Sequence, residues 1–305
     1  METLFDLNLL SSTLRIVAPL LLAALGGALC ARVGLFNVAL EGMMLIGAFS
    51  AILGNYLFGN VLVAVLFSCL CVGVVALLFA YLSVHLQANA IIVGIAINFL
   101  ALGLTAFALF VIFGNKGQYY DPNMKGLPVW HIPIVKDIPV LGDLLSGHSP
   151  LVYLAFLLAI ALQYVVYRTV PGFRLTAVGE NPSAAGSLGL RVKRYQYGAV
   201  LASGVLCALA GAQLSLGQVT LFAENMTSGR GFIALVAAML GQNNPLGVAA
   251  SSLLFGFTDA ISIRLQGLAL PTHFTMMLPY VMTIIVMFLF KDKAYLRQSG
   301  RIGGQ

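Results

Sequence analysis

The stretch VLVAVLFSCLCVGVVALLFAYLSV, residues 61–84, contains no charged side chain. About twenty apolar residues suffice for an α-helix to cross the roughly 30 Å hydrocarbon core of a bilayer. The stretch lacks period-two alternation, and a helix satisfies its own backbone hydrogen bonds where no water is present. The sequence therefore predicts a membrane-spanning helix here.

The composition extends this prediction to the whole chain. Of 305 residues, 60% are hydrophobic and 9% are charged, and the mean hydropathy is +0.97. Soluble domains carry about 25% charged residues, and a soluble protein with so apolar a surface would aggregate. This excludes a secreted protein, a nucleic-acid-binding protein and a cytosolic enzyme. We expect an all-α, polytopic membrane bundle of about eight to ten helices in a single transmembrane domain, residues 1–305.

A second feature is an interrupted helical segment near residues 231–265. Its centre, Gly241-Gln-Asn-Asn-Pro-Leu-Gly247, contains a proline without a backbone donor between two glycines. The preceding eleven apolar residues rise only about 16 Å, half of the hydrocarbon core. We expect a broken or re-entrant helix, with a packing kink as the alternative. The predicted spans are 14–31, 35–56, 61–84, 88–113, 150–167, 198–219, the pair 231–241 and 246–265, and 275–290.

The loop charges predict the orientation. The long gap 115–149 has three lysines and three aspartates, whereas residues 168–197 have five basic residues against one acid, or +4. The tail 291–305 has four basic residues against one acid, or +3. By the positive-inside rule, we expect 168–197 to be a cytoplasmic loop, 291–305 a cytoplasmic tail and 115–149 an extracytoplasmic loop. An external N-terminus is the expectation that follows.

Polar residues inside the apolar runs are candidate functional residues, because each costs free energy unless it is paired or faces water. Asn37 and Glu41 lie four apart, which on a helix places them on one face. They could glue helices together or line a pathway. Of Asn89 and Asn98, which a straight helix points to opposite sides, we expect Asn98 to face the bundle interior. For Asp259, we expect an ion pair or a hydrogen bond to a neighbour.

Catalytic patterns are missing from the sequence. It has no Gly-Lys-Ser/Thr phosphate loop, and its four histidines have no partner at metal-ligand spacing. The four cysteines lie in apolar stretches and are expected to be small buried hydrophobic residues. We expect no enzymatic activity, no metal and no cofactor bound by this chain.

The loop 168–197 is expected to contain a short helix. Asn181 is suited to cap its N-terminus, Pro182 to occupy its first position and Gly189 to follow its end. Its small side chains, Ala184 and Ala185, suit insertion into a groove of another protein. A plain connecting loop is the alternative.

Three stretches of the chain resemble one known family. Residues 172–185, GFRLTAVGENPSAA, are similar to the ribose and branched-chain amino-acid permeases of ATP-binding-cassette (ABC) importers. Residues 37–44, NVALEGMM, and 229–241, GRGFIALVAAMLG, resemble most closely the simple sugar/nucleoside branch. Ala184-Ala185 with Gly189 resembles the Glu-Ala-Ala-x-x-x-Gly coupling loop of such permeases, with Ser183 in place of its glutamate.

The resemblance implies the transmembrane permease subunit of a nucleoside importer in a bacterial cell membrane. It implies three partners: a second, different permease, a cassette ATPase that hydrolyses the ATP, and an extracytoplasmic substrate-binding lipoprotein. The implied ATPase-coupling residues are Glu180, Asn181, Ala184, Ala185 and Gly189. The candidate substrate-pathway residues are Asn37, Glu41, Asn98, Gln213, Phe232, Gln242 and Asn243.

At Gln242 and Asn243 the family often has a basic and an aromatic residue, so the cargo specificity of this chain is open. A permease for a simple sugar such as ribose, or for a branched-chain amino acid, is one alternative. From a different class, the alternative is a secondary transporter coupled to ions through Glu41 or Asp259. A channel-like or scaffold subunit is a further one.

Overall fold

The computed structural model describes residues 7–122, 124–130, 146–266 and 281. In this part of the chain, seven helices are long and apolar enough to cross a membrane, judged by length and composition. They confirm an all-α, multi-pass membrane protein. The expected span at 275–290, apart from residue 281, and the tail 291–305 lie outside the described residues, as do residues 131–145.

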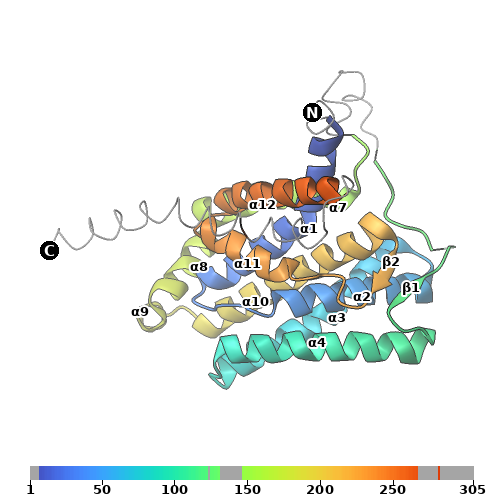
Figure 1. Ribbon diagram of the computed structural model, residues 1–305. Helices are drawn as coiled ribbons and strands as arrows, with labels where there is room; N and C mark the ends of the chain where they lie inside the picture. The colour runs from blue at the N-terminus through green and yellow to red at the C-terminus, as the bar shows by residue number, and fades with distance from the viewer. Residues whose placement is uncertain (1–6, 123, 131–145, 267–280, 282–305) are drawn as a thin grey trace.

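The spans agree closely with the apolar runs (Figure 1). The long helices are α1 (Leu7–Arg32), α2 (Leu40–Phe58), α3 (Val61–Ala80), α4 (Ala90–Phe113), α7 (Pro150–Arg168), α10 (Val192–Ala212) and α12 (Pro245–Gln266). The short helices are α8 (Val170–Glu180), α9 (Pro182–Ser187) and α11 (Arg230–Leu240). Two π-helical segments, η1 (Tyr81–His85) and η2 (Gln213–Val219), continue α3 and α10.

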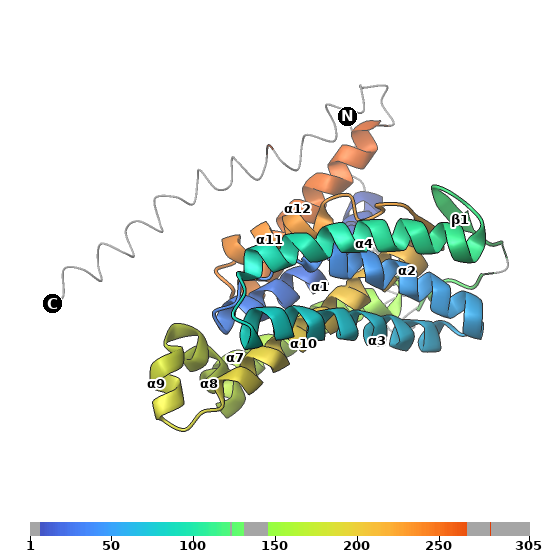
Figure 2. The same ribbon diagram turned by 90° about the horizontal axis from the view of Figure 1, so that it is seen from below.

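The two ends of the bundle carry different structures. Strands β1 (Gln118–Tyr120) and β2 (Leu221–Ala223) pair antiparallel at one end, which we call the hairpin end. Helix α9 projects from the opposite end, the α9 end, in both views (Figures 1 and 2). The Gln218 side chain donates to the backbone oxygen of Arg15, so the N-terminal part of α1 lies toward the hairpin end.

Helices α1, α2 and α10 form the centre of the bundle. Of the most apolar part of each, 78%, 83% and 78% is buried, against 22% to 28% for α3, α4 and α7. Their sequences are rich in glycine and alanine, which lets helix backbones approach closely in a membrane. At Gly211 of α10, a Cβ atom would overlap the backbone of α2 at Met44 and Ala48. The central contact thus requires glycine.

The start of α2 differs from expectation. The helix begins at Leu40 rather than near residue 35, and Asn37 lies before it in non-helical chain. Gly34 adopts φ +79, and the Asn37 side chain accepts a hydrogen bond from the backbone N–H of Ala39. This local side-chain bond stabilises a turn in place of the helix. The expectation that Asn37 and Glu41 share one helical face is therefore wrong.

The break near 231–265 is confirmed. Helix α11 ends at Leu240 and α12 begins at Pro245. In the turn between them, Gln242 and Asn243 both adopt φ +54. The two helices pack against each other, and Ser251 of α12 donates to the carbonyl oxygen of Ala237 in α11 at 2.6 Å.

The glycine contact between α2 and α10 predicts a matched pair of variants. Replacing Gly211 by alanine should force α2 and α10 apart and cost about 1–3 kcal/mol of stability, as overpacking does. Replacing Gly198, on the same helix with open space around its Cβ position, should leave stability unchanged or raise it by up to about 1 kcal/mol. The midpoints of thermal unfolding of the two purified variants in detergent compare them directly. Equal midpoints would contradict the close-packing account.

Candidate functional site

A buried carboxylate joins the beginnings of two helices inside the bundle. Glu41, the second residue of α2, is 6% exposed. One of its carboxylate oxygens accepts the backbone N–H of Gly229 at 2.8 Å, and the other accepts that of Gly231 at 2.6 Å. Helix α11 begins between these glycines, at Arg230. Glu41 therefore caps the N-terminus of α11 from another part of the chain.

Unpaired backbone N–H groups at the start of a helix explain this contact. The first backbone N–H groups of a helix have no partner within the helix, and this end carries partial positive charge. Gly229 adopts φ +83, and a Cβ on Gly231 would lie 2.5 Å from the Cα of Glu41. Glycine at both positions lets the backbone approach the carboxylate, and the bonds offset the cost of burying its charge.

Asn98 of α4 contacts the place where the starts of α2 and α11 meet around Glu41, which we call the junction. Its side-chain oxygen accepts the backbone N–H of Gly42 at 2.8 Å, and its amide donates to the carbonyl of Val38 at 3.0 Å. Asn98 faces the interior as expected, whereas Asn89 is exposed and caps the start of α4. Asn98 lies eight residues after the start of α4, or about 12 Å along the helix. The junction is thus well inside the bundle.

Asn37 also forms hydrogen bonds within the protein. Its side chain is 2% exposed and its amide nitrogen lies 3.2 Å from the Ser203 hydroxyl of α10. The structure therefore brings together Asn37, Glu41 and Asn98, and each bonds to backbone or to a neighbouring side chain. Sequence analysis did not find the partner Ser203, because a serine in an apolar run carries no distinguishing signal.

An ion pair lies beside the start of α11. Arg230 and Asp259 of α12 are 3.7 Å apart, with side chains 27% and 30% exposed. The expected ion pair of Asp259 is confirmed. Charged groups within membrane-spanning segments rarely face lipid, because that would remove them from water. This half-buried pair therefore marks a face of α11 and α12 suited to water or another protein, which we call the charged face.

The remaining candidate pathway residues lie elsewhere. Gln213 is fully buried where α10 passes into η2, and it accepts a hydrogen bond from Ser149 at 2.7 Å. Phe232 projects from α11 with 47% of its surface exposed. Gln242 and Asn243 lie in the turn before α12, where the backbone oxygen of Asn243 accepts from the Arg32 side chain at 2.8 Å. The structure does not gather these four around the junction.

At the α9 end, helices α8 and α9 form a projecting arm, residues 170–187. The Asn181 side chain accepts the backbone N–H of Ala184 at 3.0 Å, Pro182 is the first residue of α9, and Gly189 adopts φ +83. These three expectations of helix start and end are confirmed.

The two alanines of α9 differ in burial. Ala185 is buried against Val33, Val178 and Ala199, whereas Ala184 is exposed. Leu188, next to α9, is 83% exposed, and Glu180 is also exposed. The surface that another protein could contact thus contains Ala184 but not Ala185.

The arm contacts the chain just before the junction. Gly179 packs so closely on the backbone of Arg32 and Gly34 that a Cβ there would overlap the Arg32 carbonyl. Arg32 also approaches Thr176 of α8, stacks on the ring of Tyr167 and holds the turn at Asn243. Helix α8 is therefore in contact with the segments that lead to both ends of α11.

Comparison with known proteins identifies the family to which this chain is similar. The profile of the family described as "Branched-chain amino acid transport system / permease component" matches residues 9–287. The nucleoside ABC transporter permease NupC of Lactococcus lactis is 37% identical, covering 90% of both chains. The guanosine ABC transporter permease NupQ of Bacillus subtilis is 36% identical, covering 93% of this chain and 92% of its own.

Two further matches are more distant. TsgC13 of Haloferax volcanii, a permease assigned to glucose ABC transport, is 34% identical over 87% of this chain and 80% of its own. A solved inward-facing ABC transporter, assigned to the metal-chelate type, has a TM-score of 0.52 and covers 90% of this chain and 84% of its own. With 16% identity, this second likeness concerns the fold alone.

The cap on α11 predicts the effect of Glu41→Gln. An amide presents one acceptor oxygen, so it can serve only one of the two N–H groups, and its own N–H₂ opposes the other. We expect a loss of about 1–3 kcal/mol, the usual cost of an unsatisfied buried group. The thermal midpoint of the purified variant measures it. The control is Glu224→Gln, whose carboxylate accepts the backbone N–H of Gly117 in an exposed position. A midpoint as high as the control's would argue against the cap.

Proposed function

The chain belongs to the branched-chain amino acid transport permease family, and we propose that it is the transmembrane permease subunit of an ABC importer for nucleosides. The observation that carries the proposal is the similarity, along nearly the whole chain, to permeases of nucleoside and guanosine transporters. The structure supports it with a multi-pass bundle, an exposed arm at one end and a charged face on α11 and α12.

We assign the α9 end to the cytoplasm of a bacterial cell and the hairpin end to the outside. The basic excess of residues 168–197 lies at the α9 end, as the positive-inside rule requires. The strands β1 and β2 and the segment 115–149 are then extracytoplasmic. The N-terminal part of α1 is at the same end, in agreement with an external N-terminus.

We assign α9 as the element that docks in the ATPase. Asn181 and Gly189 define its two ends, and Ala185 fixes it to this chain. Ala184 and Glu180 lie on the exposed side, where a partner can reach them. This chain supplies no catalytic group, and the ATPase subunit hydrolyses the ATP.

The contacts of the arm suggest how its movement would reach the pathway. Gly179 touches Arg32 and Gly34, and Arg32 holds the turn after α11. Residues 35–40 lead from Gly34 to Glu41, which holds the start of α11. A displacement of α8 therefore acts on both ends of α11. We propose that ATP-driven closure of the ATPase pair moves the arm and reorients α11 and α12, giving alternating access.

We place the cargo pathway along the charged face, between this chain and a second, different permease. A neutral nucleoside is recognised by a few oriented polar groups on an apolar surface. Arg230, Asp259 and the exposed Phe232 offer these on α11 and α12. Asn37, Asn98 and Glu41 support the start of α11 from behind, and Gln213 supports the outer end of α10. Gln242 and Asn243, in the turn at the α9 end, would lie at the cytoplasmic exit.

A simple sugar remains the strongest alternative cargo, since a relative assigned to glucose transport is 34% identical. A branched-chain amino acid is supported by the description of the family alone, whereas the three relatives above are assigned to nucleosides, guanosine or glucose. An ion-coupled transporter that uses Glu41 has little support, since both oxygens of this carboxylate bind backbone N–H groups.

The cargo prediction is tested by uptake. Cells that make this chain together with the second permease, the ATPase and the substrate-binding lipoprotein should accumulate labelled guanosine. Excess unlabelled nucleoside should abolish that uptake. Excess ribose, glucose or leucine should leave it unchanged. Uptake blocked by the sugars and not by nucleosides would overturn the nucleoside assignment in favour of the sugar permease.

The docking prediction is tested at Ala184. Its replacement by tryptophan should abolish uptake and the co-purification of the ATPase, because a large side chain would obstruct the contact surface of α9. Its thermal midpoint should stay unchanged, because Ala184 is exposed. The control is Ala177→Trp, an exposed position on α8, which should transport normally. Normal uptake by the Ala184 variant would contradict the docking role.

A further inference from the structure

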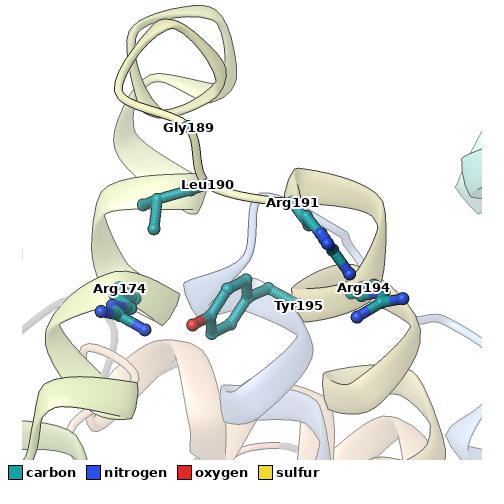
Figure 3. A pocket seen from close by; sticks show the side chains of 6 residues that line it. All are labelled: Arg174, Gly189, Leu190, Arg191, Arg194 and Tyr195. Carbon is teal, nitrogen blue, oxygen red and sulfur yellow. The ribbon is translucent and has the colours of Figure 1, made fainter.

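An open pocket lies at the root of α9. Its volume is about 360 Å³, and its lining comes from α8, from the link between α9 and α10, and from the first turn of α10. Figure 3 shows the lining residues, which are Arg174, Gly189, Leu190, Arg191, Arg194 and Tyr195. The arginines approach from α8 on one side and from α10 on the other, and the Tyr195 ring lies between them.

The pocket has an uncompensated positive charge. Arg174, Arg191 and Arg194 are exposed, and in the described part of the chain none of them forms an ion pair or a side-chain hydrogen bond. By contrast, Arg32, on the neighbouring end of α1, makes contacts with Asn243 and Thr176. Three unpaired guanidinium groups around one cavity repel one another, and an anion between them would relieve that repulsion.

The depth of the pocket follows from the helix lengths. Helix α7 has 19 residues, about 28 Å, which matches the hydrocarbon core and places its end, Arg168, near the core boundary. Arg174 follows six residues later. The span Val192–Val219 has 28 residues, about 42 Å, so it extends beyond the core by roughly 12 Å. If this excess is divided equally between its two ends, Arg191 and Arg194, at its start, come about 6 Å beyond the core, at the level of the lipid headgroups.

We propose that this pocket binds the phosphate headgroup of an anionic phospholipid of the cytoplasmic leaflet. The proposal rests on the orientation given under the proposed function. Guanidinium groups bind phosphate oxygens bidentately, and the Tyr195 hydroxyl adds a further donor. Leu190 offers apolar surface beside the charges for the first methylene groups of the acyl chains. Basic pockets at the cytoplasmic ends of membrane helices suit such headgroups, and here the lipid is present at high local concentration.

A headgroup in this position would bridge the arm and the bundle. Arg174 belongs to α8, whereas Arg191 and Arg194 belong to the link after α9 and to α10. A phosphate held by both sides would fix the root of α9, the helix assigned to ATPase docking. The anionic lipid content of the membrane would then set how firmly the arm is held.

The test measures lipid binding to the full chain, purified together with whatever subunits accompany it. Native mass spectrometry after titration with phosphatidylglycerol, and separately with phosphatidylcholine, counts the bound lipids. The wild type should bind phosphatidylglycerol in preference. The double variant Arg191→Gln/Arg194→Gln should bind it at least about tenfold more weakly, since hydrogen bonds to charged groups are lost. Lys193→Gln removes an exposed charge outside the pocket lining and should bind as the wild type does.

The proposal is overturned if the double variant and the wild type bind phosphatidylglycerol equally, or if the wild type binds phosphatidylcholine and phosphatidylglycerol equally. Displacement of the lipid by inorganic phosphate at equal concentration would instead assign the pocket to a free anion. Lipid binding that appears only after the ATPase has been removed would assign the pocket to a carboxylate of that subunit. An unchanged thermal midpoint shows that the double variant is folded. Because binding is measured without cargo, a failure of nucleoside uptake leaves the lipid result standing.

Discussion

The carboxylate of Glu41 is the contact on which the rest of the site depends. It binds the backbone N–H groups of Gly229 and Gly231 and so lets α11 begin inside the bundle. At membrane depth no water can serve these N–H groups, and a helix start there needs a partner from the protein. The helix terminus offers the Glu41 side chain two hydrogen-bond donors and a favourable dipole. Without this contact, the short helix α11 would have no fixed beginning.

Close helix packing makes this contact geometrically available. Lipid tails are as apolar as leucine, so the central helices are held together by backbone approach at small residues and by buried polar bonds. Gly211 brings α10 onto α2, and Gly42 lets Asn98 reach the turn before α2. The peripheral helices α3 and α4 expose large apolar side chains instead. The bundle therefore has a tightly packed, largely apolar centre that contains a few buried polar bonds, and an apolar periphery, as expected for a protein immersed in lipid.

The two exposed features at the α9 end have separate physical origins. Helix α9 begins at the Asn181 cap and is followed by Gly189, so both of its ends are set by nearby residues of the sequence. The basic pocket depends on three segments, because Arg174 meets Arg191 and Arg194 only once α8 has folded back beside α10. The contact of Gly179 with Arg32 and Gly34 connects both features to the junction around Glu41. The arm is thus connected to the junction by a close backbone contact at Gly179 and by the Arg32 side chain, which reaches Thr176 and Asn243.

Much of this protein was determined by its sequence alone. The spans, the break at Pro245, the ends of α9 and the inward direction of Asn98 follow from hydropathy, proline, capping residues and helical period, which act within one or two helical turns. The conformation of Asn37 could not be predicted in this way. Its side chain can stabilise a turn by accepting the N–H of Ala39, or it can lie in a helix, and residue spacing does not decide between the two. Only the tertiary structure paired Glu41 with residues 188 and 190 positions away, Arg230 with Asp259, and Ala185 with its own chain rather than a partner. Such pairs depend on how helices distant in sequence pack in three dimensions, and no local periodicity encodes that.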